Sequence, residues 1–192
     1  YYVRAYATNA AGTAYGQNEE FMTLPALPTV TTDTVSMLTD SSAVSGGEVV
    51  FDGGDSVTVR GLLYGRYAGL TIDSLKTMDG SDEGVFTSNL SSLDPGTTYY
   101  IRAYATNGVG TGYGAEINFT TPAILPTVVS DTISMVTDSS AMSGGTVLLD
   151  GGAMVTARGV VWGTSPNPEL GGDATTNGSG SGAFTSAMTN LS

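Results

Sequence analysis

Two copies of a Tyr-x-Arg-x-Tyr pattern carry the side chains of this sequence that are best suited to contact another molecule. They are Tyr2, Arg4 and Tyr6 in the first copy and Tyr100, Arg102 and Tyr104 in the second. Alternate residues of a β-strand share a face, so each triplet is expected to form an outward ladder. Such a ladder can stack on a glycan or bind a neighbouring domain through cation–π contacts. The alternative, which we favour, is cross-strand packing that stiffens the sheet.

The acidic stretch from Asp79 to Glu83 is a second group with chemical potential. Its carboxylates have the density of oxygen ligands that calcium prefers. The matching stretch 98 residues later, from Asn177 to Ser181, contains no carboxylate. Because a site needed in each repeat would not vanish from the next, we favour a solvated loop without a bound metal. The alternative is a calcium site in this copy only.

Catalytic chemistry has few candidate residues in this chain. The sequence contains no His and no Cys, which removes the usual general base, the thiol nucleophile and the zinc-thiolate site. The glycine-rich residues 178–182 are not followed by the Lys and helix that a phosphate-binding loop requires. We therefore expect a protein that is not an enzyme and uses no cofactor.

Net charge and hydropathy exclude several classes of binding partner. The formal net charge is −12, with only 6 Lys and Arg residues against 18 Asp and Glu. Nucleic acids and anionic membrane surfaces both attract basic proteins, so neither is an expected partner. No apolar run approaches the 20 or so residues that a membrane-spanning helix needs, so this segment is not expected to insert in a bilayer.

An internal repeat of 98 residues sets the elements that must position these side chains. Residues 1–9 match residues 99–107 with a single change, Val3 for Ile101, and 47 of the 94 overlapping positions are identical. A period this long indicates that each repeat is a domain with its own core. Abundant Thr, Ser, Val, Tyr and Gly, with little charge, favour strands and turns over helices. The sequence predicts an all-β protein.

Turn signals divide the central repeat into short strands separated by regular intervals, as a β-sandwich requires. Asp52, Gly53 and Gly54 form one such turn, because glycine accepts a positive φ. Residues 65–83 are where the two copies differ most, and we expect a loop region with one short strand. The other predicted strands are residues 28–39, 43–51, 56–64, 84–93, 98–106 and 114–121.

Residues 93–110 resemble the fibronectin type III domain. That family carries a Leu-x-Pro-x-Thr-x-Tyr corner before its strand F, here formed by residues 93–99, followed by Ala-x-Asn and Gly at residues 105–110. The resemblance implies that Tyr99 and its equivalent Tyr1 are corner tyrosines, whose hydroxyls bond to the main chain upstream. The residues of strand C (158–163) and of strand F (1–9 and 99–107) are similar to a variant found in tandem arrays on Bacteroidota surface proteins.

The repeat phase also predicts how the domains are divided. Residues 1–24 supply strands F and G of one sandwich, residues 25–122 a complete domain, and residues 123–192 strands A to E of a further sandwich. Neither end piece is expected to stand alone, since an isolated hairpin is marginal in water and an open sheet edge invites pairing. We therefore expect residues 1–24 of the next chain or copy to complete residues 123–192, through covalent continuity or strand donation. Such head-to-tail contacts build open filaments.

Short Asp-Ser/Thr-apolar motifs form a further candidate site. They resemble the O-glycosylation signal of exported Bacteroidota proteins and would place sugars on Thr34, Thr132, Ser56 or Ser74. Thr34 and Thr132 occupy the same phase of the repeat, on the predicted first strand, and are the stronger pair. The alternative is that Thr simply suits a strand.

These observations predict a structural repeat of an extracellular fibre, stalk or adhesin on a bacterial surface, with identical copies joined head to tail. Two alternatives remain at this stage. One is a module that binds a glycan or a protein through its outward aromatic side chains or through residues 65–83. The other is a non-catalytic spacer of a secreted multidomain enzyme.

Overall fold

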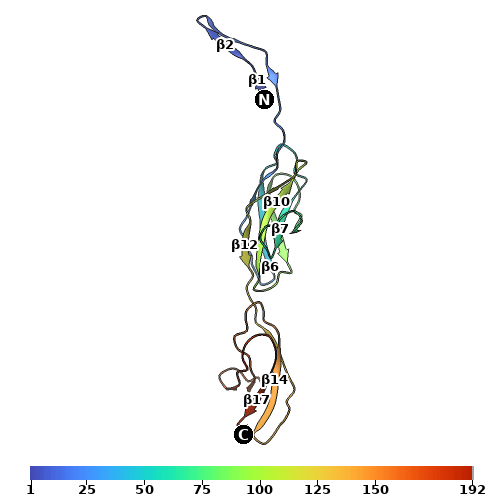
Figure 1. The fold of residues 1–192 in the computed structure, drawn as a ribbon, viewed down its shortest axis with the longest axis vertical. Helices are drawn as coiled ribbons and strands as arrows, with labels where there is room; N and C mark the ends of the chain where they lie inside the picture. The colour runs from blue at the N-terminus through green and yellow to red at the C-terminus, as the bar shows by residue number, and fades with distance from the viewer. Residues whose placement is uncertain (192) are drawn as a thin grey trace.

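The computed structural model describes residues 1–191, and these residues form β-strands, turns and loops without a helix. The all-β prediction is therefore confirmed. Three parts follow one another along the long axis: an N-terminal hairpin arm, a central sandwich and a C-terminal unit (Figure 1). Within residues 1–191 there is accordingly no helix long and apolar enough to cross a membrane.

The strands fall into three groups. The arm contains β1 (Tyr2–Val3), β2 (Tyr6–Asn9), β3 (Gly12–Tyr15) and β4 (Glu19–Glu20). The central sandwich contains β5 (Thr29–Thr32), β6 (Ser42–Phe51), β7 (Val59–Gly65), β8 (Leu75–Lys76), β9 (Gly84–Ser91), β10 (Thr98–Thr106), β11 (Thr111–Tyr113) and β12 (Ile117–Thr120). The C-terminal unit contains β13 (Thr127–Ser130), β14 (Ser140–Leu149), β15 (Val161–Trp162), β16 (Asp173–Ala174) and β17 (Gly182–Thr189).

The central unit is a fibronectin type III-like β-sandwich. One sheet has the order β5-β6-β9, and the facing sheet has the order β11-β10-β7-β8, with β12 also paired to β10. Alternating residues of both sheets point into a shared core, as the spacing of apolar residues requires. The buried members of this core are Val30, Ala43, Val49, Val57, Leu62, Phe86, Leu90, Leu93, Tyr99, Ile101, Ala103, Ala105 and Phe119.

The predicted last strand, residues 114–121, contains only the shorter β12 in the structure, and a further strand, β11, precedes it. Tyr104 pairs with Tyr113 in β11, whereas Ile101 pairs with Ile117 in β12, so the partner strand has one residue more between these pairs than β10 has. At this irregularity the Ala103 N–H leaves the ladder and donates to Thr32 Oγ1 at 3.0 Å. The first predicted strand is also shorter than expected, because β5 ends at Thr32.

A second apolar cluster lies on the other face of β10, where the sequence predicted an exposed ladder. Tyr104 is only 1% exposed and packs with Leu63 and Leu70. Tyr100 and Arg102 are half-buried beside it. The burial of Tyr104 excludes this residue from an outward contact ladder, because the loop over residues 65–80 folds across this face of the sheet.

The C-terminal unit repeats only part of this architecture. Its sheet β13-β14-β17 reproduces β5-β6-β9 at the same register, but β15 pairs only with the short β16. Three buried residues, Val147, Val155 and Phe184, form its apolar cluster. Among the described residues this unit has no counterpart of β10, β11 and β12 in contact with it.

Candidate assembly surfaces

The hairpin arm is already folded in the geometry of the strands that it repeats. In β2 and β3, Tyr6 pairs with Tyr15 and Thr8 with Thr13. These pairs lie 98 positions before the pairs of Tyr104 with Tyr113 and Thr106 with Thr111. The register of β1 with β4 likewise reproduces that of β10 with β12. The arm is thus a preformed copy of strands F and G.

Side-chain contacts within the arm also match those of the central unit. The Arg4 guanidinium carbon lies 4.1 Å from the centre of the Tyr15 ring, and the Arg102–Tyr113 pair lies at 4.7 Å. The rings of Tyr1 and Phe21 stack at 5.3 Å, as do those of Tyr99 and Phe119 at 5.9 Å. The Gly16 N–H donates to the Ala5 carbonyl at 2.8 Å, as Gly114 does to Ala103 at 2.9 Å.

The arm and its equivalent strands in the central unit differ in the exposed fraction of their side chains. The exposed fraction is 74% for Tyr1 and 6% for its equivalent Tyr99, and 73% for Tyr6 against 1% for Tyr104. Every residue of β2 and β3 is exposed. A row of exposed large apolar side chains is typical of a surface that binds another protein surface.

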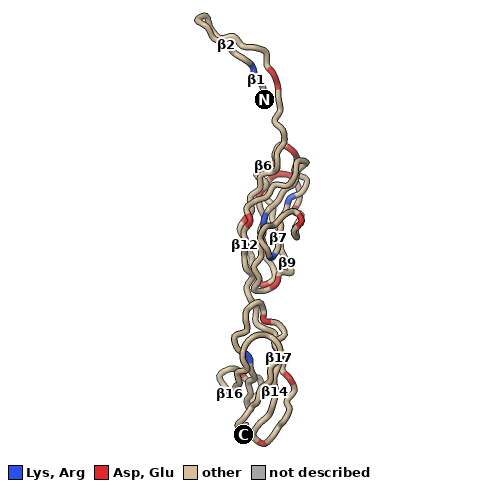
Figure 2. Tube along the Cα trace, in the orientation of Figure 1, with Lys and Arg blue, Asp and Glu red and all other residues tan. Residues whose placement is uncertain are grey.

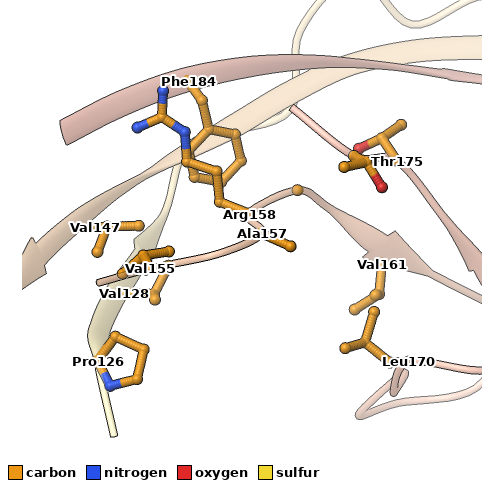
Figure 3. A pocket seen from close by; sticks show the side chains of 12 residues that line it. Pro126, Val128, Val147, Val155, Ala157, Arg158, Val161, Leu170, Thr175 and Phe184 are labelled. Atoms are coloured by element: carbon orange, nitrogen blue, oxygen red, sulfur yellow. The ribbon is translucent and has the colours of Figure 1, made fainter. Parts of the chain in front are cut away.

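The C-terminal unit has an apolar face that is open at the matching place. A pocket of about 260 Å³ lies over β14, β15 and β17, and its lining side chains point into it from both sheets (Figure 3). The lining residues include Val128, Val147, Val155, Val161, Leu170 and Phe184. Val128 is 54% exposed, whereas its equivalent Val30 in the closed sandwich is 8% exposed. This pocket is the part of the core that β10 to β12 fill in the central unit.

The contacts of Tyr104 show what such an open face accepts. The Tyr104 hydroxyl donates to the Thr77 carbonyl at 2.8 Å, and its ring lies over Gly61, where a Cβ would overlap the Thr77 carbonyl and crowd the ring. Burial, and secondarily the charge of Asp79, raise the pKa of Tyr104 above the usual value of 10.0. In the C-terminal unit Gly159 is the equivalent of Gly61, and Thr175 is the equivalent of Thr77. The glycine beneath the ring and the carbonyl that accepts from the hydroxyl are therefore both present.

A contact between the central and C-terminal units joins two glycine turns. The corner at Pro95 and Gly96 lies against the turn at Gly151 and Gly152, so closely that a Cβ on Gly96 would overlap the Gly152 carbonyl. A Cβ on Gly152 would in turn overlap the Pro95 carbonyl. Gly54, the equivalent of Gly152, has open space around it. One end of the central sandwich is therefore docked and the other is free.

The linker between these units is hydrogen-bonded at both ends. The Gly96 N–H donates to the Pro122 carbonyl at 3.2 Å, and the Ile124 N–H donates to the Gly151 carbonyl at 2.9 Å. The first linker repeats the second of these bonds, from Ala26 to Gly53 at 2.8 Å. Each linker is thus tied to the turn of the domain that follows it.

The corner tyrosine of the central unit has the geometry that its motif implies. The Tyr99 hydroxyl accepts a hydrogen bond from the Asp94 N–H at 3.0 Å. The ring is buried against the core and Phe119. The role of Tyr1 as a corner tyrosine stays a prediction.

The acidic residues 79–83 are engaged within the protein. Asp79 accepts hydrogen bonds from Thr77 Oγ1 and Ser88 Oγ, and Glu83 accepts one from the Asp52 N–H at 2.7 Å. Residues 1–191 contain no group of three or more acidic side chains arranged to hold a metal ion. Acidic residues are scattered along the whole length of the molecule, with few basic residues between them (Figure 2).

The predicted glycosylation residues lie at different kinds of position. Thr34 and Thr132 are exposed and follow strands β5 and β13, beyond the paired residues rather than on the strand itself. Ser56 is exposed, and Ser74 is half-buried with its hydroxyl accepting from the Thr71 N–H at 3.1 Å. Use of any of these residues for glycosylation stays a prediction.

Sequence reasoning missed three anchoring side chains. Arg60 Nη1 donates to the carbonyls of residues 82, 83 and 84, and Arg158 repeats this with residues 180, 181 and 182. Glu116 accepts from the N–H groups of Gly69 and Leu70 and fixes the loop that covers Tyr104. The repeat of Arg60 at Arg158 was a usable signal, whereas nothing in the sequence links Glu116 to residues 46 positions away.

Strand order, core and corner together define the class of the central unit, an all-β, fibronectin type III-like sandwich within a tandem array. Among solved structures, the chain is similar to the crystal structure of the chicken CNTN1 FN1-FN3 domains, with a TM-score of 0.39 and 14% sequence identity. That match covers 98% of this chain and 64% of the chicken chain. No protein-family model matches the sequence, and no curated protein matches it.

Proposed function

We propose that this chain is a non-catalytic structural segment of an extracellular fibre, stalk or adhesin, in which sandwiches follow one another head to tail. The observation that carries the proposal is the docked contact of Pro95 and Gly96 with Gly151 and Gly152. The glycine turn of this contact recurs at Gly53 and Gly54, so that half of the contact is repeated along the chain. The hydrogen bonds of Pro122 and Ile124 hold the linker in the same place.

Surface chemistry supports a mechanical role over a ligand-binding role. Tyr104, the side chain best suited to stack on a sugar in the central copy, is buried. Proline restricts the linkers, with two prolines in residues 25–28 and two in residues 122–126. An array of docked domains with short, restricted linkers resists bending, since each junction has a defined geometry. We further propose a Bacteroidota surface as the source, on the resemblance of strands C and F.

Electron microscopy of native material tests this function. Long, thin fibres beaded at one domain per repeat are expected. Compact particles, or strings that bend freely at every junction, would contradict a load-bearing array.

A further inference from the structure

We infer that the hairpin arm of one chain binds the open face of the C-terminal unit of a second copy and completes its sandwich. This inference rests on the proposed function and names the partner that makes the array propagate. The arm and the C-terminal unit lie at opposite ends of the molecule with the central sandwich between them (Figure 1). The arm of a chain cannot reach its own C-terminal unit over that length, so an arm that occupies the open face belongs to a second copy.

The central unit supplies the register of this complex. There, β10 pairs with β7 so that Tyr104 faces Gly61 and Thr106 faces Val59. Moved by one repeat, Tyr6 of the arm faces Gly159 and Thr8 faces Ala157. The Tyr6 hydroxyl then reaches the Thr175 carbonyl, as Tyr104 reaches that of Thr77. Strand addition of this kind pairs the edge that β15 leaves open.

Further anchors are retained at the β2–β3 turn of the arm. Asn107 donates to the carbonyls of Ala26 and Asp52 at 2.7 and 2.8 Å, which fastens the hairpin turn to the linker and to the β6 turn. Asn9 is its equivalent, and Asp150 is the equivalent of Asp52. Leu125, which is 88% exposed, is the equivalent of Leu27, which lies beside Gly110 in the central unit.

Paired substitutions match the arm to the C-terminal unit better than to the central one. In the central unit a Cβ on Gly108 would press on the Asp55 carboxylate, which accepts from the Gly108 N–H at 2.8 Å. The arm has Ala10 in place of Gly108, and the C-terminal unit has Ala153 in place of Asp55. The added methyl group and the removed carboxylate therefore fall opposite one another.

A second pair changes in the same concerted way. Glu116 accepts from the Leu70 N–H, which anchors the covering loop. The C-terminal unit has Pro168 at the position of Leu70 and so has no N–H there, and the arm has Asn18 in place of Glu116. The lost donor and the lost carboxylate are again partners across the same contact.

Ala14 shows where the complex must differ from its template. Its equivalent Gly112 lies so close to β5 that a Cβ would overlap the Pro28 carbonyl. Strand β3 therefore has to lie farther from Pro126 than β11 lies from Pro28. The β2 contacts with β15, which involve no such overlap, are the ones that position the arm.

Engineered disulfides in the full chain test this register, since the natural sequence contains no Cys. The double variant Thr8→Cys/Ala157→Cys is expected to form chain-to-chain disulfides under mild oxidation, giving a ladder of dimers and higher species on non-reducing gels. The matched control Thr8→Cys/Thr156→Cys turns the second cysteine to the other face of the strand and is expected to give at least tenfold less product. Equal crosslinking of both variants, or none, overturns the inference.

The mass of the chain in solution provides a second test, which does not depend on disulfide formation. The mass of the unmodified chain should rise above that of the 19.5 kDa monomer as its concentration is raised. Tyr6→Asp should abolish that rise, whereas Tyr67→Asp, at a tyrosine that is 84% exposed on the central unit, should leave it unchanged. A monomer at every concentration overturns strand donation, and beaded native fibres would then still support the proposed function. Closed rings of crosslinked chains would instead support strand donation and contradict an open fibre.

Discussion

Strands β2 and β3 and their repeats β10 and β11 have the same cross-strand register and opposite surroundings. The Arg–Tyr stack, the aromatic pair and the Gly-to-Ala hydrogen bond recur in both. In one copy the apolar side chains are buried between two sheets, and in the other they face solvent. The comparison teaches that neighbouring side chains specify the hairpin locally, while its stability has to come from the sheets that cover it.

The neighbouring strand shows the same dependence from the other side. Strand β7 has seven residues and lies between β10 and β8, whereas its repeat β15 has two residues and pairs only with β16. Residues 157–160 keep the sequence of a strand, including Arg158 and Gly159, but their backbone hydrogen bonds run to residues 175–178 on one side only. Strand C thus needs strand F to be complete.

Truncation of the two equivalent tyrosines should give the largest contrast. Tyr104→Ala is expected to lower the free energy of unfolding of the central sandwich by about 3–5 kcal/mol, because it empties a fully buried site. Tyr6→Ala should change it by less than about 0.5 kcal/mol in dilute solution, because that ring is exposed. Urea unfolding followed by circular dichroism measures both, and similar losses in the two variants would break the comparison.

The covered copy should also lose stability at high pH. Burial, with a smaller effect from Asp79, raises the pKa of Tyr104 above the value of 10.0 in the unfolded chain. The folded state therefore holds this proton more tightly, and stability should fall as the pH rises from about 10 through the folded pKa. Tyr104→Phe should remove this alkaline slope and cost about 1 kcal/mol at neutral pH through the lost bond to Thr77. An unchanged slope would assign the titration to another group.

The glycine turns offer a subtler contrast between a docked and a free end. Gly152 and Gly54 have φ values of +82° and +81°, so substitution by Ala strains both backbones alike, by about 1–2 kcal/mol. Only at Gly152 would the new methyl group overlap the Pro95 carbonyl. Small-angle X-ray scattering of monomeric chains should therefore show looser coupling between the central and C-terminal units in Gly152→Ala alone. Equal behaviour of the two variants would show that the contact does not hold the junction.

The sequence predicted what depends on local pattern. The 98-residue period located the strands, and the corner motif located Tyr99 with its hydrogen bond to Asp94. The sequence did not predict the burial of Tyr104, because alternation assigns a side chain to a face of the sheet but does not indicate whether other residues cover that face. The cover is the aperiodic loop held by Glu116, whose partners lie 46 and 47 residues earlier. The docked glycines were missed because a turn pattern does not indicate what lies against it.

Trp162 provides the most direct test of strand donation, since it is the single tryptophan of the chain and lies on β15. By the register of Ile101 with Tyr64, Val3 of an incoming arm lies opposite it. The account predicts that Trp162 emission shifts to shorter wavelength as the chain is concentrated, and that Tyr6→Asp abolishes the shift while Tyr67→Asp preserves it. Emission that is constant across the concentration series, from a chain whose sandwich is folded, would contradict the account.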